Sequence, residues 1–254
     1  MSDPEVKILP KSLPPKWEQT AKDELRAAIR KFAKPLADLV ARDANEGDTR
    51  ILITDFLCEG LGFDKFEDLS TEYAVKGEYA DYVIRIDKQL IAFIEVKRAA
   101  QKLNSRHLRQ VETYAVKEGV EWIILTNGQV WQVYHSITSP LQPVATHLVF
   151  EVDILGEDAP AKKIEFLAYL HKSFLKRGLI DELWKRKAAT SALALSHLLL
   201  SPAILEALRK QIRRNSNYSP DTKELARVLK AEVIIPALLA QFSLIVAEKE
   251  NPIR

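Results

Sequence analysis

The stretch IAFIEVKRAA, residues 91–100, decides the fold of the region around it. Large apolar or aromatic side chains fill most of its first six positions, which is typical of a buried central strand. Glu95 and Lys97 interrupt this pattern two residues apart. Because side chains alternate along a strand, both lie on one face. A carboxylate and an ammonium in a buried strand need polar partners, so the residues opposite them on the neighbouring strand have to be identified.

The segment before this strand, ADYVIRI, is a second predicted strand, and Asp87–Gln89 separate the two. If these residues form a three-residue hairpin loop, antiparallel pairing places Asp81 directly opposite Glu95. Directly opposed Cβ atoms lie about 4.5–5.5 Å apart. The sequence therefore predicts two carboxylates and one ammonium on a small patch of sheet.

Two adjacent carboxylates repel each other, and Lys97 offsets only one of the two charges. A divalent cation would offset the other, and oxygen ligands favour Mg²⁺ or Mn²⁺ over zinc. Such an ion can polarise a phosphoryl oxygen and generate hydroxide from water. The alternative is a half-exposed sheet edge with a cross-strand ion pair, in which Asp81 only caps the hairpin.

Working outward, the chain divides into three predicted regions: an N-terminal arm and helices over 1–44, an α/β core over 45–155 and a helical C-terminal region over 156–254. Residues 1–15 indicate an extended arm, and Pro35 predicts a break in the helical segment that follows. The core is expected to contain a helix at 45–62, strands at 69–75, 80–86 and 90–98, a helix at 103–118, and strands at 121–126, 129–135 and 147–154.

The composition is that of a soluble globular protein. The chain has 254 residues, of which 47% are hydrophobic and 28% charged, so it can bury a core. It has no apolar run of about 18 residues and no N-terminal signal pattern, so we expect a cytoplasmic protein without a membrane partner. The single cysteine, Cys58, forbids an internal disulfide, and the five histidines are scattered without zinc-ligand spacing.

The net charge is only +2, but it is unevenly distributed. Residues 97–109 hold five Lys or Arg and no acid, and residues 162–214 hold twelve basic and four acidic side chains. Such blocks are compatible with a surface for a polyanion. Taken alone, they are more typical of Lys and Arg side chains that only solvate helix faces.

Two motifs around the starting stretch carry a resemblance to a known group of enzymes. Asp81, thirteen intervening residues and Glu95-Val96-Lys97 are similar to the D-x(n)-E-x-K signature of the PD-(D/E)xK nuclease superfamily. Gln110 and Tyr114, one turn apart on the following helix, resemble the Q-x-x-x-Y motif of RecB-like nucleases. Over about residues 45–135 the sequence resembles the N-terminal domain of type I restriction enzyme R (motor) subunits.

The resemblance implies a restriction-endonuclease-like α/β fold, αβββαβ with a mixed sheet flanked by helices, and Mg²⁺-dependent cleavage of DNA. It implies that Asp81 and Glu95 are metal ligands, with the Val96 carbonyl as a third and Glu46 as a further ligand from the first core helix. Lys97 would be the catalytic lysine. A first-turn acid such as Glu46 also suits the helix dipole without any metal.

On the next helix, the resemblance implies that Gln110 and Tyr114 support the site or contact DNA. The residues that we expect to bind nucleic acid are basic or polar side chains from the end of the strand and the start of this helix: Lys97, Arg98, Arg106, Arg109 and Gln110.

The sequence departs from the family in two respects. Ala80 replaces the proline of the superfamily signature, which is usual there. No G-x-x-x-x-G-K-[ST] motif occurs, so we expect a free-standing relative without the helicase motor.

The leading hypothesis is a metal-dependent deoxyribonuclease of restriction or defence type. One alternative is a nuclease-fold module that binds nucleic acid or a protein partner without cutting, and another is a structural oligomer. The C-terminal helices can grip phosphates, cap the core or form a homodimer, and the sequence does not choose among these roles.

Overall fold

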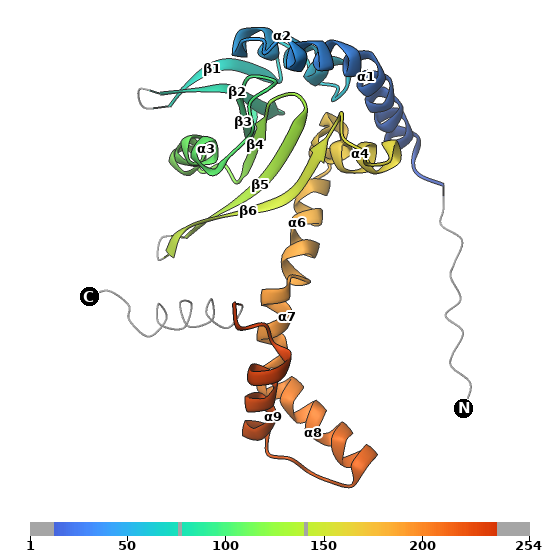
Figure 1. Ribbon diagram of the computed structural model, residues 1–254, viewed down its shortest axis with the longest axis vertical. Helices are drawn as coiled ribbons and strands as arrows, with labels where there is room; N and C mark the ends of the chain where they lie inside the picture. The colour runs from blue at the N-terminus through green and yellow to red at the C-terminus, as the bar shows by residue number, and fades with distance from the viewer. Residues whose placement is uncertain (1–12, 76–77, 140–141, 238–254) are drawn as a thin grey trace. The chain divides into compact units, whose positions relative to one another are not determined.

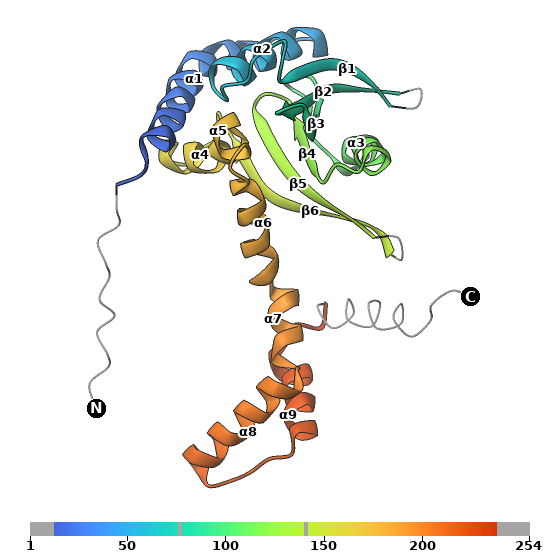
Figure 2. The same cartoon turned by 180° about the vertical axis from the view of Figure 1, so that it is seen from behind.

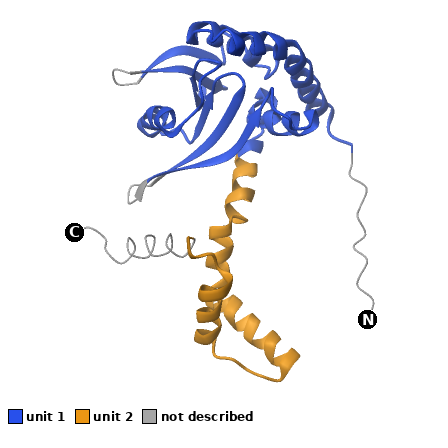
Figure 3. Ribbon diagram, viewed as in Figure 1, with its two compact units in different colours: residues 1–180 blue, residues 181–254 orange. Residues whose placement is uncertain are grey.

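The computed structural model describes residues 13–75, 78–139 and 142–237. The chain forms two compact units, Met1–Ile180 and Asp181–Arg254, which are coloured separately in Figure 3. Most of the expected N-terminal arm and the end of the C-terminal region lie outside the described residues. The first unit contains the sheet, and the described part of the second unit is helical.

The elements of the first unit follow the predicted order. They are α1 (Lys16–Ala41), α2 (Glu46–Glu59), β1 (Leu69–Val75), β2 (Glu78–Ile86), β3 (Gln89–Val96), α3 (Ser105–Glu118), β4 (Trp122–Thr126), β5 (Val130–Ser139), β6 (Gln142–Asp153), α4 (Pro160–Leu167), the 3₁₀ turn η1 (Ala168–Leu170) and α5 (Lys172–Leu175).

The sheet is mixed and its strands lie in sequence order. Neighbouring strands are antiparallel except β3 and β4, which are parallel. Helix α3 makes the crossover between these two parallel strands, as a parallel connection requires. The expected αβββαβ core with a mixed sheet and helices is confirmed in α2-β1-β2-β3-α3-β4, and β5 and β6 extend it.

Helices cover the two faces of the sheet. The Tyr82 hydroxyl donates to the Arg50 carbonyl oxygen of α2 at 2.8 Å, so this side chain faces α2. Its neighbour Val83 belongs to a buried cluster with Val111 and Tyr114 of α3. Because adjacent side chains of a strand point to opposite faces, α2 and α3 pack on opposite sides of β2 and β3. Figures 1 and 2 show this arrangement from the front and from behind.

The β2–β3 hairpin differs from the expected one at its turn. A three-residue loop was expected, but Ile86 pairs with Gln89 and only Asp87 and Lys88 form the turn. Their φ angles are +49° and +68°. A two-residue turn with both central residues at positive φ twists in the same sense as the strands that it joins. The expectation failed because Asp-Lys lacks the glycine that usually marks such a turn.

An irregularity in the ladder compensates for the shorter turn. The register shifts between Ile84 and Arg85, and beyond this point Tyr82 pairs with Ile94. One further step along the same register brings Asp81 level with Glu95. The expected juxtaposition of the two carboxylate-bearing positions is therefore reached by a different route, a tight turn followed by a bulge.

The break expected at Pro35 does not occur, because α1 continues through it. Proline removes one backbone hydrogen bond from a helix, a loss that normally costs about 3 kcal/mol. Pro35 is exposed, whereas Phe32, Leu36 and Leu39 on either side of it are buried. Packing of these apolar side chains holds the helix together across the missing bond.

The C-terminal helices α6 (Leu179–Ala189), α7 (Ala192–Leu199), α8 (Pro202–Ser216) and α9 (Thr222–Val228), with the π-helical turn η2 (Leu229–Val233), confirm the helical C-terminal region. Several large apolar side chains of the second unit are exposed, among them Leu195, Leu198, Val233 and Ile235. A homodimer through these helices stays a prediction. In the described ranges no single helix is long and apolar enough to cross a membrane. There, only the pair α7 and α8, bent by 65°, has the length and composition of a span.

Candidate active site

Hydrogen bonds to β4, α2 and the turn after β4 hold the end of β3 and the loop that follows it. The Lys97 amide donates to the Thr126 carbonyl oxygen of β4 at 2.8 Å, so the strand geometry continues to Lys97. The loop that follows is fixed by two side chains. Thr49 of α2 accepts the Ala99 amide at 3.1 Å, and Asn127 donates to the Ala99 carbonyl at 3.2 Å. These contacts position Lys97 against the start of α2.

Asp81 lies where the neighbouring strand is distorted. In β1, Thr71 and Tyr73 pair with β2, but Glu72 between them has a φ of +49°. The Asp81 carboxylate is 13% exposed and both of its oxygens have donors. Oδ2 accepts the Val96 amide of β3 at 2.8 Å, and Oδ1 lies 3.1 Å from Nη1 of Arg50 on α2.

Glu95 and Lys97, which their spacing places on one face of β3, form an ion pair. The Lys97 ammonium donates to Oε1 of Glu95 at 2.6 Å, and the Glu95 side chain is only 2% exposed. The other carboxylate oxygen, Oε2, is buried without a hydrogen-bond partner. Burial and then the nearby Asp81 charge raise the pKa of Glu95 from 4.5 to about 7, although Lys97 acts in the opposite direction.

Lys97 stays charged in this setting. Burial favours its neutral form, but the hydrogen bond to Glu95 and the charges of Glu95, Glu46 and Asp81 outweigh burial and raise its pKa. The contact with Glu46 is longer, at 3.9 Å between Nζ and Oε2. Glu46 is the first residue of α2, where Asn45 caps the helix by accepting the Asp48 amide. The capped start of α2 therefore faces the end of β3.

The site holds one negative charge too many. Its three carboxylates are those of Asp81, Glu95 and Glu46, and its two cations are Arg50 and Lys97. A buried carboxylate oxygen without a donor is costly unless a proton or a cation reaches it. The predicted ligands, Asp81, Glu95, Glu46 and the Val96 carbonyl, are all hard oxygen donors, the type that Mg²⁺ and Mn²⁺ prefer.

The unpartnered Glu95 oxygen fits a divalent cation, but Asp81 fits it less well because both of its oxygens already have donors. Within the part of the chain that the structure describes, no three His, Cys, Asp or Glu side chains are grouped to hold a metal ion. The metal ligands therefore stay a prediction.

Helix α3 carries the second predicted motif. The Gln110 amide donates to the Tyr114 hydroxyl at 3.2 Å, so these two residues meet as expected for positions one turn apart. Tyr114 is 1% exposed, and its ring lies 6.3 Å from that of Phe93, two residues before Glu95. Because Phe93 and Glu95 lie two residues apart, Tyr114 packs on the face of β3 that carries Glu95.

The predicted nucleic-acid contacts lie on the surface. Arg106 and Arg109 are exposed on the first turns of α3. Arg98 is also exposed and forms an ion pair with Asp43 at 3.2 Å. His107, between the two α3 arginines, is half-buried, and its Nδ1 has no partner. Burial and then the charges of Lys97 and Arg106 lower its pKa, so its imidazole is neutral near the site.

Three residues of the site were not predicted from the sequence. Arg50 was not singled out because an arginine on an amphipathic helix usually only solvates it. Its position one turn after Glu46 was the available signal, since residues four apart share a helix face. Thr49 and Asn127 are buried and fix the loop after β3. In the sequence, Thr49 looks like an ordinary helix residue and Asn127 like an ordinary turn residue.

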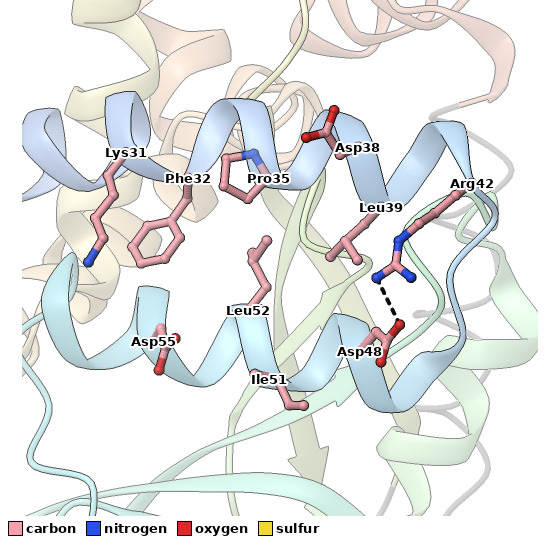
Figure 4. A pocket seen from close by; sticks show the side chains of 10 residues that line it. All are labelled: Lys31, Phe32, Pro35, Asp38, Leu39, Arg42, Asp48, Ile51, Leu52 and Asp55. Atoms are coloured by element: carbon pink, nitrogen blue, oxygen red, sulfur yellow. Dashed lines mark hydrogen bonds and ion pairs between the residues drawn. The ribbon is translucent and has the colours of Figure 1, made fainter.

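A separate cavity of about 470 Å³ lies between α1 and α2, and none of the predicted site residues lines it. Figure 4 shows it, with the Arg42–Asp48 ion pair at one end. Its lining residues are Lys31, Phe32, Pro35, Asp38, Leu39, Arg42, Asp48, Ile51, Leu52 and Asp55. The charged side chains there form no group comparable with the carboxylates at the end of β3.

Comparison with protein families gives a match over part of the chain. No curated protein and no solved structure matches the chain. Residues 45–145 match the family model of the type I restriction enzyme R protein N terminus. The matched segment begins at the cap of α2 and includes β1 to β5 and α3, so it contains every predicted site residue. The resemblance seen in the sequence is thereby confirmed over residues 45–145, which are similar to the N terminus of type I restriction enzyme R proteins.

Proposed function

We propose that the chain is a metal-dependent nuclease of restriction type, which hydrolyses phosphodiester bonds in DNA with Mg²⁺ or Mn²⁺. One observation carries the proposal. Glu95 is buried beside Asp81, and its Oε2 has no donor although Lys97 is bound to Oε1. A stable fold rarely retains such a cost outside a functional site. The family match over residues 45–145 supports a restriction-type domain.

A divalent cation, when bound, polarises a phosphoryl oxygen and acidifies a water molecule. The residues that would hold it are Asp81 and Glu95, with the Val96 carbonyl and Glu46. Because the pKa of Lys97 is raised, its ammonium stays protonated near neutral pH and cannot accept a proton. Its role is to donate hydrogen bonds to the attacking water or to the phosphate oxygens on which charge develops.

DNA is the proposed substrate, and its phosphates would meet the basic start of α3. Arg106 and Arg109 are exposed there, next to the half-buried His107 and beyond the site loop. Phosphate contacts of this kind hold the backbone in position without reading the base sequence. They would bring a strand across the end of β3, where Lys97 lies.

The test is DNA cleavage by the wild type and by Lys97→Ala, with Lys102→Ala as the control. Lys102 is an exposed lysine of the same loop. We expect the wild type to cut DNA with Mg²⁺ or Mn²⁺ and to stop with EDTA. Loss of a donor to developing charge typically lowers the rate by about 10²–10³-fold, and we expect at least this for Lys97→Ala. Because Lys97→Ala removes the partner of the buried Glu95 carboxylate, circular dichroism must show that the variant is folded, and its DNA binding in Ca²⁺ should weaken far less than its cutting. Full cutting by a folded Lys97→Ala variant would reject the role of Lys97.

A second candidate is a module of the same fold that binds nucleic acid or a protein without cutting. The observation in its favour is that both Asp81 oxygens already have donors, Arg50 and the Val96 amide. If the wild type binds DNA but neither Mg²⁺ nor Mn²⁺ elicits cutting of single-stranded or duplex DNA, this second candidate replaces the first.

A further inference from the structure

Arg50 has an unusual place in the site. Its backbone is fixed, because its carbonyl oxygen accepts hydrogen bonds from the Thr54 and Tyr82 hydroxyls at 2.9 Å and 2.8 Å. Its side chain reaches across to Asp81 and makes an ion pair of 3.1 Å with Oδ1. Since Oδ2 is held by the Val96 amide, Arg50 covers the one oxygen of Asp81 that no backbone group of β3 uses.

The guanidinium also borders open space. Arg50 is 33% exposed, and it lines a cavity of about 200 Å³ together with Ile51, Thr54, Thr71, Glu72, Asp81 and Tyr82. A second cavity of about 390 Å³ shares Ile51, Thr54, Thr71 and Tyr82 with the first, so the space continues along α2 and β1. A guanidinium that leaves Asp81 therefore has room beside it.

Asp81 can bind either the Arg50 guanidinium or a divalent cation. A divalent cation and a guanidinium both need the lone pairs of a carboxylate, so they compete for Asp81 Oδ1. Arginine presents a planar fork of donors that matches the oxygens of a phosphate, which lysine does not. Once it is free of Asp81, Arg50 offers this fork to the cavity that it lines.

We propose that Arg50 binds a phosphate of the substrate. Asp81 holds the Arg50 guanidinium until a divalent cation binds Asp81 and displaces the guanidinium, which makes cation binding and DNA binding cooperative. The inference rests on the proposed function, because it requires that Asp81 bind the cation. The inference predicts a coupling free energy between the cation and DNA. Each ligand must therefore strengthen the binding of the other by the same factor.

The experiment measures this coupling without cleavage. Mn²⁺ affinity is determined by calorimetry on the DNA-free protein. The affinity for a phosphorothioate DNA duplex is determined with and without Ca²⁺. The variants are Arg50→Gln, Arg50→Lys and Asp81→Asn. Arg42→Gln is the matched control, since it removes the same charge from another Arg–Asp pair at the start of α2, 2.9 Å long.

We expect Arg50→Gln to bind Mn²⁺ several-fold more tightly than the wild type, because its competitor is gone, and to bind DNA more weakly in Ca²⁺. The factor by which Ca²⁺ strengthens DNA binding should fall by about fivefold or more, the usual lower range of such couplings. Arg50→Lys keeps the charge without the fork, so we expect only part of the coupling. Arg42→Gln should keep all of it.

Two results would overturn the inference separately from the function. If the wild type binds Mn²⁺ through Asp81, but Arg50→Gln binds it no more tightly, Arg50 does not compete with the cation. If Arg50→Gln and Arg50→Lys both keep the wild-type coupling, Arg50 does not bind the phosphate. If the wild type binds no Mn²⁺ and Asp81→Asn behaves identically, the proposed function fails and the inference fails with it.

Discussion

Helices α2 and α3 flank the same strands from opposite faces, but they serve the site differently. Helix α2 sends two charged side chains to it: Glu46 lies 3.9 Å from Lys97 and Arg50 lies 3.1 Å from Asp81. Helix α3 buries Val111 and Tyr114 against the sheet and keeps its arginines at the surface.

The motif that is easier to see in the sequence, on α3, makes fewer polar contacts with the site carboxylates than α2 does. Gln110 and Tyr114 stand out in the sequence, yet the contact that the structure gives Gln110 is with Tyr114 itself. Arg50 belongs to no motif and touches a predicted metal ligand. Helix α3 therefore contributes packing and surface charge, whereas α2 sets the charge balance of the site.

The largest expected effect tests the packing role of α3. Replacing a buried aromatic ring by alanine usually costs about 3–5 kcal/mol, and Tyr114 is 1% exposed, so Tyr114→Ala should lower the free energy of unfolding by this amount. Tyr114→Phe removes only the hydroxyl that Gln110 contacts, and it should cost about 1 kcal/mol. Urea unfolding measures both. If Tyr114→Phe keeps stability but abolishes DNA cleavage, the hydroxyl acts in the reaction and the contrast between the helices is too simple.

A second prediction concerns the carboxylate between the two helices. The pKa of Glu95 is about 7 in the folded protein against an ordinary 4.5, so the folded state holds the proton more tightly than the unfolded chain. Its contribution to stability is fully present below pH 4.5 and is lost as the pH rises through about 7.

We therefore expect the unfolding free energy of the wild type to fall, relative to Glu95→Gln, by up to about 3 kcal/mol between these pH values. Denaturant unfolding at several pH values in EDTA measures the difference. Adding Mg²⁺ at pH 8 should restore stability to the wild type and not to Glu95→Gln. If the unfolding free energies of the two proteins change in parallel with pH, folding does not raise the pKa of Glu95.

The smallest expected effect tests the surface charge of α3. Reversing Arg106 and Arg109 to Glu should weaken DNA binding about equally on all sequences, because phosphate contacts do not read bases. The slope of log K against log salt should shrink by about 0.9 for each phosphate that the variant no longer neutralises. Reversal of the exposed Arg30 and Lys34 on α1 is the control. An unchanged slope in the α3 variant would mean that these arginines only solvate their helix.

The strands and their pairing were readable in the sequence because the relevant signals are local. An apolar run, a charged pair two residues apart and an Asn-Gly turn each arise from neighbouring residues. The hairpin turn was misjudged by one residue, since Asp87 and Lys88 adopt positive φ without a glycine. The bulge that restores the register is a property of two strands packed between helices, and no single segment encodes it.

The sequence by itself determined the α/β class, the element order and the resemblance to the type I restriction enzyme R N terminus, and it singled out Asp81, Glu95 and Lys97. Only the tertiary structure decided the charge balance around them. The approach of α2 to β2 gives Asp81 a guanidinium partner and leaves one oxygen of Glu95 without a donor. The physical reason is that motifs fix which groups a segment carries, whereas the distances between groups on separate elements depend on how those elements pack.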